Sequence, residues 1–416
     1  MHAGQRDLDI VLYGATGFIG KLTAEYLAGA GAGIRVGLAG RSADRLRAVR
    51  RNLGAVAQDW PVITADLSQP AALKAMAART QVVVSAVGPY SRYGLPVVAA
   101  CAAAGTDYAD LTGEVPFVRD SIDFYHQQAA DNGARIVHSC GFDSILSDLT
   151  VYALHRRATD DGAGQLGDTT LVLRAYSGGY AGGSIATMME LMRIAVDDPK
   201  MRRMLDDPYS LSPDRSAEPE LGAQPDLPSC AGSDIAPELK GLWVGGYVMA
   251  LYNTRCVRRS NALLGFAYGS RFRYQETITH GSTVAAPVIA AMFNAGIAGA
   301  SRLGGWYLQM LPPGLVERMT PPSATGHDEG SRGHYKVETY TSTSKGRRYM
   351  ATMAQRRDPG YSATAVMVGE SALCLATDRD RLSPLRGVLT PAAAMGDALS
   401  ARLTAAGVTI TTAQLN

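Results

Sequence analysis

The feature that most constrains the fold is a glycine-rich turn close to the N-terminus. A mostly apolar run, residues 9–13, leads into three glycines spaced three residues apart, and a helix-forming segment, residues 21–27, follows. The turn itself consists of Gly14, Ala15, Thr16, Gly17, Phe18, Ile19 and Gly20. This order of strand, glycine turn and helix is typical of a dinucleotide-binding unit, in which the glycines permit a tight turn, close approach of a pyrophosphate and packing of the helix. We therefore expect these seven residues to bind a dinucleotide at the N-terminus of the helix.

Further short apolar runs continue this pattern. They alternate with helix-forming segments, as they do in proteins with a parallel, doubly wound sheet. The expected strands are residues 9–13, 35–39, 62–65, 82–87, 107–110 and 135–138. The N-terminal part is therefore predicted to be an α/β Rossmann domain.

The ends of the second, third and fourth strands indicate which dinucleotide binds. Arg41 and Ser42 stand where NAD-binding folds carry an acidic residue, and a guanidinium beside a hydroxyl suits the 2′-phosphate of NADPH. Ser42 also fits as the N-cap of the next helix. Asp66 is expected to approach the adenine or, alternatively, to cap a helix. Gly88 and Pro89 are expected to contact the nicotinamide half, because ligands bind outside the carboxyl ends of parallel strands.

The pattern changes after residue 148. Alternating segments at 271–279, 334–343 and 347–356 predict a mixed or antiparallel sheet with helices. A glycine-rich stretch, 178–184, is expected to open a helix that runs to about residue 196. We expect an NADPH-binding domain at 1–148, a substrate or oligomerisation domain at 149–384, and a C-terminal segment, 385–416, that packs back on the first domain.

Composition excludes few classes of protein. The net charge of +2 gives no reason to expect a nucleic-acid partner, and the five cysteines are dispersed without a C-x-x-C pair. Asp107, Asp110 and Glu114 resemble a metal cluster, but their spacing fits capping and domain bridging better, so we expect no metal. The absence of an apolar signal region favours a cytoplasmic protein.

An uncharged stretch complicates this location. Residues 284–300 are mostly Ala, Val, Ile, Met and Phe, yet proline, asparagine and glycines interrupt the segment and argue against a membrane span. A buried or oligomer-facing helix is the favoured interpretation. A helix that lines a substrate site or touches the inner face of the membrane is the alternative.

Five motifs are spread over nearly the full length, at 13–21, 88–94, 105–114, 140–144 and 387–397. Together they resemble the saccharopine dehydrogenase-like oxidoreductases. Two further motifs in the second domain, at 218–226 and 258–263, resemble the mycobacterial trans-acting enoyl reductase subfamily. The resemblance implies a Rossmann domain with an inserted mixed-sheet domain, and reduction of a carrier-bound enoyl intermediate of a polyketide synthase on the way to phthiocerol and phenolphthiocerol lipids. Leu146 departs from the family pattern, which has proline there; we expect this to alter the rigidity of a helix start rather than the chemistry.

Enoyl reduction needs a hydride, a donor for the enolate oxygen and a proton for the α-carbon. The sequence lacks the Tyr-x-x-x-Lys pair of short-chain reductases, and the candidates are Tyr90, Tyr93 and Asp143, which follow strand ends. The alternative, which the sequence does not make less favourable, is a structural role, in which Tyr90 packs on the nicotinamide and Tyr93 packs at the joint between the two domains. An amino-acid oxidoreductase like saccharopine dehydrogenase and a non-catalytic NADPH sensor remain the alternative functions.

Overall fold

The computed structural model describes residues 6–30, 33–177, 198–303 and 333–416. The chain divides into two compact units, each formed by separate stretches of sequence. The first unit contains 1–112, 117–145 and 361–406, and the second contains 113–116, 146–360 and 407–416.

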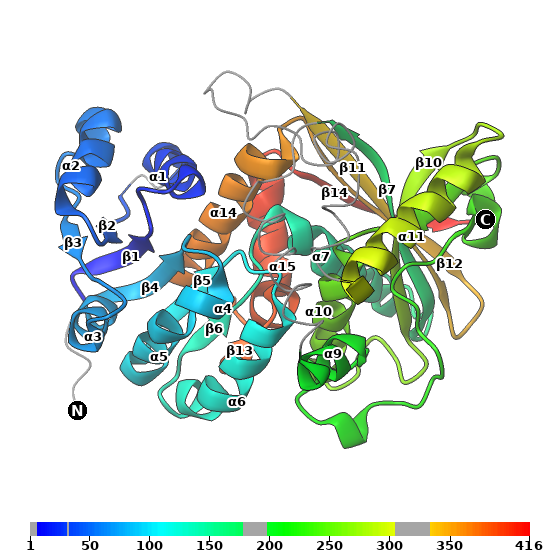
Figure 1. Ribbon diagram of the computed structural model, residues 1–416, viewed down its shortest axis with the longest axis horizontal. Coiled ribbons are helices and arrows are strands. Elements are labelled where there is room, and N and C mark those ends of the chain that lie inside the picture. Colours follow the sequence, from blue (N-terminus) through cyan, green and yellow to red (C-terminus); the bar gives the residue numbers. More distant parts are fainter. Residues whose placement is uncertain (1–5, 31–32, 178–197, 304–332) are drawn as a thin grey trace. The chain divides into compact units, whose positions relative to one another are not determined.

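The first unit is built on a parallel sheet. In the described part of the chain this sheet has seven strands in the order β13-β6-β5-β4-β1-β2-β3, and every neighbouring pair is parallel (Figure 1). The strands are β1 (Leu8–Tyr13), β2 (Val36–Gly40), β3 (Val62–Thr64), β4 (Thr80–Ser85), β5 (Asp107–Asp110), β6 (Arg135–Val137) and β13 (Gly387–Leu389). Most residues of β1, β2 and β4 are buried, as expected for strands covered on both faces by helices. The predicted α/β Rossmann class is confirmed.

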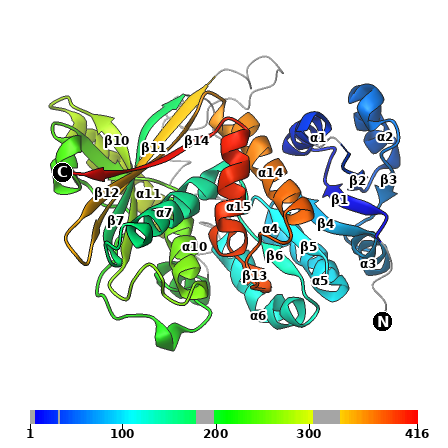
Figure 2. The same cartoon turned by 180° about the vertical axis from the view of Figure 1, so that it is seen from behind.

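Helices alternate with most of these strands along the chain. They are α1 (Phe18–Ala30), α2 (Ala43–Asn52), α3 (Pro70–Ala78), α4 (Tyr90–Tyr93), α5 (Leu95–Ala104), α6 (Val115–Asp131), α14 (Thr364–Thr377) and α15 (Pro391–Ala405). A further helix, α7 (Phe142–Asp160), begins in the first unit and continues in the second. The helices α14 and α15 lie side by side in both views (Figure 1 and Figure 2).

The second unit contains a mixed sheet. Its order is β14-β12-β11-β7-β10-β9-β8; β7 and β10 are parallel, and the other described pairs are antiparallel. The strands are β7 (Leu166–Ser177), β8 (Cys230–Ala231), β9 (Trp243–Gly246), β10 (Arg273–Gly281), β11 (His334–Thr343), β12 (Arg348–Gln355) and β14 (Thr409–Leu415). Three helices accompany it: α9 (Pro199–Asp206), α10 (Ala250–Leu263) and α11 (Ala286–Leu303).

The two faces of this sheet are covered differently. On one face α7 and α10 supply polar contacts, such as the 2.7 Å bond between the hydroxyls of Thr150 and Thr339. A small apolar cluster covers the other face, where Val172 and Tyr340 of the sheet meet Ala236 and Leu239 of the connecting segment.

Two expectations about the domains need correction. The C-terminal segment 385–416 does not return as a whole to the first unit, because β14 pairs with β12 in the second sheet. The stretch 361–384, expected in the second domain, belongs to the first unit, where α14 packs on α1 and contacts β1, β4 and β5. Local sequence patterns could not reveal either assignment, because each depends on which distant segments of the chain pack or pair with one another. The helix expected after residues 178–184 lies outside the described residues.

Candidate functional site

The glycine turn forms the centre of the candidate site. β1 lies between β4 and β2, so the strand order reverses beside it, and a crevice for a dinucleotide is expected at the carboxyl ends of these strands. Gly14 has φ +87°, and a Cβ there would overlap Val87 of the segment after β4. A Cβ on Gly20 would overlap the carbonyl oxygen of Gly14. Each of these two glycines is therefore required by the fold itself.

Gly17 differs from the other two. A Cβ on Gly17 would meet only the carbonyl oxygen of Gly14, at 3.4 Å, and the residue is exposed. Packing within the folded chain therefore does not require glycine at position 17. A ligand that approaches the backbone closely at the start of α1 would require it, because a side chain there would be in the way. The turn therefore fits the dinucleotide pyrophosphate that its sequence predicts.

Arg41 and Ser42 lie at the carboxyl end of β2, as the sequence predicted. Ser42 caps α2, since its Oγ accepts a 3.4 Å hydrogen bond from the backbone N–H of Arg45. Arg41 and Arg45 are both exposed, and neither forms an ion pair with any described residue. Arg45, which sequence reasoning missed, is a second exposed arginine in the first turn of the helix that Ser42 caps. Its position three residues after the cap is the signal that could have identified it.

Asp66 is engaged in a local turn. Its Oδ1 accepts hydrogen bonds from the backbone N–H of Ser68 at 2.9 Å and from the Ser68 hydroxyl at 2.6 Å. These bonds, together with the charge of Arg41, lower the pKa of the Asp66 carboxyl. The Asp66 side chain thus closes a turn with Ser68 and does not cap α3, whose N-cap is Gln69. The lowered pKa keeps the carboxylate charged beside the expected adenine end.

The segment after β4 carries the candidate tyrosines. Gly88 and Pro89 are joined by a cis peptide bond, and Pro89 is the N-cap of the short helix α4. The Tyr90 hydroxyl donates to the Ser85 carbonyl oxygen at 2.8 Å and accepts from the Leu111 N–H at 3.4 Å, while its ring is buried. These contacts favour a structural role for Tyr90. Tyr93 is 40% exposed, so part of its side chain is accessible.

Asp110 organises the ends of β5 and β6. Its Oδ2 lies 2.8 Å from Nδ1 of His138 and accepts from the hydroxyl of Tyr108 at 3.0 Å. Its Oδ1 accepts from the backbone N–H groups of Thr112 at 3.1 Å and Ser139 at 3.0 Å. Ser139 has φ +67°, a left-handed conformation that is costly for a residue other than glycine and is often found near functional sites. Asp110 thus holds both strand-end loops in place.

Asp107 and Cys140, near the same strand ends, make structural contacts. Asp107 accepts from Arg135 and Arg379, at 3.4 Å and 2.9 Å. The Cys140 thiol is buried and points to the Val137 carbonyl oxygen at 3.6 Å. No group of His, Cys, Asp and Glu residues in the described ranges has the arrangement of a metal site. Asp143 lies in the first turn of α7, half-buried, after the loop that Asp110 holds.

The two motifs of the second unit that resemble the enoyl reductase subfamily hold the fold together. Asp226 pairs with Arg255 of α10 at 2.6 Å. From the same helix, Arg258 donates to the Tyr274 carbonyl oxygen at 2.9 Å, and Arg259 donates to the Leu211 carbonyl oxygen at 2.6 Å. Burial lowers the pKa of the Arg258 guanidinium to about 10. These buried arginines fasten the irregular segment between α9 and β9 to the unit.

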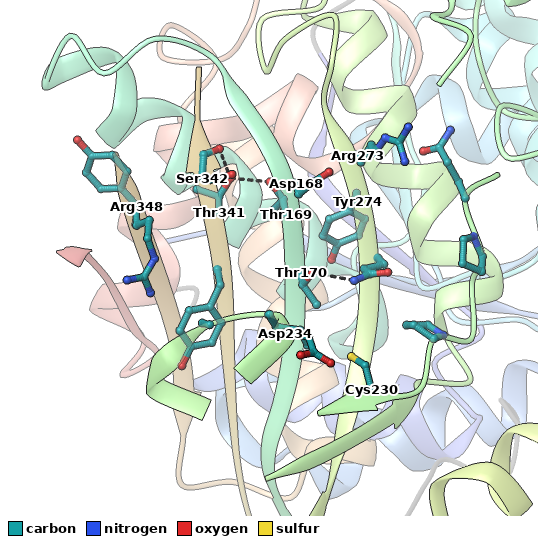
Figure 3. A pocket seen from close by; sticks show the side chains of 18 of the residues that line it. Asp168, Thr169, Thr170, Cys230, Asp234, Arg273, Tyr274, Thr341, Ser342 and Arg348 are labelled. Atoms are coloured by element: carbon teal, nitrogen blue, oxygen red, sulfur yellow. Dashed lines mark hydrogen bonds between the residues drawn. The ribbon is translucent and has the colours of Figure 1, made fainter. Parts of the chain in front are cut away.

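The second unit also contains a cavity of about 600 Å³ that sequence reasoning missed (Figure 3). Strands β7, β10, β11 and β12 form one side, and residues 223–236 form the other. Its lining mixes both charges, with Arg273 and Arg348 as well as Asp168 and Asp234, and the Gln275 amide donates to the Thr170 hydroxyl at 3.0 Å. The cavity depends on pairing between distant strands, so no local pattern could reveal it.

The uncharged stretch forms α11, as expected for a helix. Ala286, Ala290 and Ile297 are buried, and α11 contacts β9 and β10. Its outward positions Val288, Ile289, Met292 and Phe293 are apolar and exposed, as is Val284 just before the helix. Among the described helices, none combines the length and apolar character that a membrane span requires.

Comparison with known proteins agrees with this geometry. The family model for the saccharopine dehydrogenase NADP binding domain matches residues 10–137. A candidate trans-acting enoyl reductase of Mycobacterium tuberculosis is 62% identical over 418 residues, and the trans-acting enoyl reductase of Mycobacterium bovis is 60% identical over 419 residues; both alignments cover 100% of each chain. The apo saccharopine dehydrogenase (L-Glu forming) of Saccharomyces cerevisiae has a similar fold, with a TM-score of 0.56 and 14% identity over 98% of this chain and 100% of that one. The chain therefore belongs to the trans-acting enoyl reductases within the saccharopine dehydrogenase-like family, and it is an oxidoreductase with an NADP(H)-binding domain.

Proposed function

We propose that the protein reduces a carbon–carbon double bond of an enoyl thioester carried by a polyketide synthase, in the biosynthesis of phthiocerol- and phenolphthiocerol-type lipids. Identity of about 60% over the full length to named trans-acting enoyl reductases carries this proposal. The word "trans-acting" in those names describes an enzyme separate from the synthase that it serves. A carrier-bound polyketide or fatty acyl chain is therefore the proposed substrate.

The residues around the glycine turn are proposed to hold the cofactor. Backbone N–H groups from Gly14 to Gly20 would bind the pyrophosphate, Arg41 and Ser42 with Arg45 would bind the 2′-phosphate, and Asp66 would lie beside the adenine. Gly88 and Pro89 would contact the nicotinamide half. When bound, NADPH supplies the hydride for the β-carbon of the enoyl group.

The chain must then hold the thioester oxygen and deliver a proton to the α-carbon. Tyr93 is the proposed proton donor, because its side chain is accessible whereas the Tyr90 hydroxyl is bound to backbone groups. Asp143 is the second candidate, since it follows the loop that Asp110 and Ser139 shape. Tyr90 would act by keeping the segment after β4 in register with the end of β5.

The test is turnover of an enoyl thioester on its acyl carrier protein with NADPH, measured by the loss of absorbance of the reduced nicotinamide and by mass spectrometry of the acyl chain. The proposal expects saturation of the double bond, and a Tyr93→Phe variant that binds NADPH normally but reduces kcat. Reduction of NADP⁺ by saccharopine-type substrates, without turnover of the acyl thioester, would favour the amino-acid oxidoreductase. NADPH binding without turnover of any acyl substrate would refute the proposed activity.

A further inference from the structure

A residue from the C-terminal part of the chain supports the glycine turn. Just before α14, residues Pro359–Ala363 form a π-helical turn, a rare conformation that is found frequently at functional sites. Tyr361, the central residue of this turn, belongs to the first unit and is 7% exposed.

Tyr361 packs against Phe18, the first residue of α1. The ring centroids are 4.5 Å apart and the planes meet at 70°, an edge-to-face arrangement that is favourable for aromatic pairs. Phe18 itself is 45% exposed, so part of its surface remains open beside the turn. Tyr361 therefore fixes an exposed aromatic ring where a dinucleotide is expected to bind.

The packing of α14 against α1 holds Tyr361 close to the start of α1. Gly369 of α14 lies so close to the Tyr26 ring of α1 that a Cβ would overlap it. The Tyr26 hydroxyl donates to the carboxylate of Glu370, which also accepts from Arg402 at 3.2 Å. These contacts hold the two helices together, so the π-helical turn has little freedom to move away from Phe18.

The start of α14 lies on the nicotinamide side of the crevice. A Cβ on Gly141, after β6, would lie 3.4 Å from Cγ2 of Thr364 and 3.0 Å from Cβ of Leu111, after β5. The α14 helix also contacts β1, β4 and β5, whereas the residues expected at the adenine end follow β2 and β3. The ring pair thus lies among the elements that face the nicotinamide half in a doubly wound fold.

We propose that Tyr361 is a positioning residue for the nicotinamide half of NADPH, and that it acts by holding the Phe18 ring against the cofactor. The inference rests on NADP(H) binding and does not depend on the acyl substrate. It predicts that loss of the ring pair weakens binding of the whole cofactor while leaving the adenine half unaffected. A purely structural role in the first unit would weaken both.

Isothermal titration calorimetry with two ligands tests this proposal. NADPH probes the whole site, and 2′,5′-ADP probes the adenine half alone. For Tyr361→Leu we expect the Kd of NADPH to rise about three- to tenfold, the range that corresponds to one aromatic pair, with the Kd of 2′,5′-ADP unchanged. Tyr361→Phe keeps the ring and should restore NADPH binding.

Two further variants guard against a folding defect. Phe18→Leu alters an exposed side chain and should reproduce the selective loss, and the double variant should be no worse than either single one because both remove the same interaction. Phe124→Leu alters another exposed aromatic residue, in α6, and should change neither Kd. Equal losses for both ligands, no loss with Phe18→Leu, or additive effects in the double variant would overturn the proposal.

Discussion

Glu276 on β10 provides a direct test of the buried network in the second unit. Its carboxyl group is fully buried; the Tyr274 hydroxyl donates to Oε1 at 2.9 Å and the Asn253 amide donates to Oε2 at 3.1 Å. Burial raises the pKa of this carboxyl from 4.5 to about 7, although hydrogen bonds from Ser147, Asn253 and Tyr274 oppose the shift. We predict that Glu276→Gln makes the free energy of unfolding less sensitive to pH in the range between about 4.5 and about 7.

The magnitude follows from the difference between the folded and unfolded pKa values. Each pKa unit corresponds to 1.36 kcal/mol, so the shift in Glu276 corresponds to about 3 kcal/mol. Below a pH of about 4.5 the group is protonated in both states and costs nothing. As the pH rises, the unfolded state ionises first, and the free energy of unfolding falls until the pH exceeds the folded pKa of about 7. Glutamine stays neutral and avoids this loss.

Urea unfolding of the wild type and the variant, followed by circular dichroism at about pH 5 and about pH 8, measures the effect. Relative to the wild type, the variant should gain about 3 kcal/mol in unfolding free energy between the two conditions. Equal pH dependence of the two proteins would refute the assignment of a raised pKa to Glu276.

Glu338→Gln is a matched control, because the pKa of the Glu338 carboxyl is shifted in the opposite direction to that of Glu276. Burial raises the pKa of Glu338, but hydrogen bonds from Lys336 and Tyr340 and the charge of Arg174 outweigh it and lower the pKa. The charged carboxylate therefore stabilises the fold above its unfolded pKa, and this contribution is lost as the pH falls through the lower folded value. The variant should be less stable than the wild type near neutral pH, and the difference should narrow in acid.

Three further predictions concern the first unit. The Gly17→Asp variant should have the melting temperature of the wild type, because the new side chain fits the fold. Its affinity for NADPH in calorimetry should fall by about 100-fold or more, because the side chain carries negative charge into the pyrophosphate site. The Gly20→Ala variant, in contrast, should have a lower melting temperature. Arg41→Ala should weaken NADPH binding by about 10- to 100-fold and NADH binding little, and equal losses for the two cofactors would contradict a 2′-phosphate contact. Asp110→Ala should cost about 3–5 kcal/mol of unfolding free energy, since it leaves several buried donors without an acceptor. An unchanged denaturation midpoint would contradict the role of Asp110 in holding the loops after β5 and β6.

Much of the first unit was predictable because its signals are local. Six of its strands were correctly expected. The seventh, β13, was missed because it pairs with β6 from a part of the chain far from the alternating N-terminal pattern. In the second unit, β10, β11 and β12 were expected from their alternation, whereas β9 and the role of α10 were not. The buried arginines of α10 contact backbone carbonyl groups far away in sequence, and no spacing within the helix reveals such partners.

The candidate site divides in the same way. The turn from Gly14 to Gly20 and the cap at Ser42 were predictable from their own neighbours. The engagement of the Tyr90 hydroxyl with Ser85 and Leu111 was not, because it depends on how the ends of β4 and β5 lie relative to each other. The sequence alone therefore gave no reason to prefer Tyr90 or Tyr93 as the catalytic residue. The structure distinguishes them, because the Tyr90 hydroxyl is hydrogen-bonded to backbone groups whereas the Tyr93 side chain is accessible.

By itself, the sequence identified the cofactor that this protein uses, NADPH. A glycine turn after a first strand and an arginine after the second are short-range features, and their chemistry depends on the backbone conformation and charge of a few adjacent residues. Tertiary structure alone decided which distant groups support that site: Tyr361 behind Phe18, and Asp110 between the loops after β5 and β6. The physical reason is that these contacts form between segments remote along the chain, and their geometry exists only once helices and strands have packed.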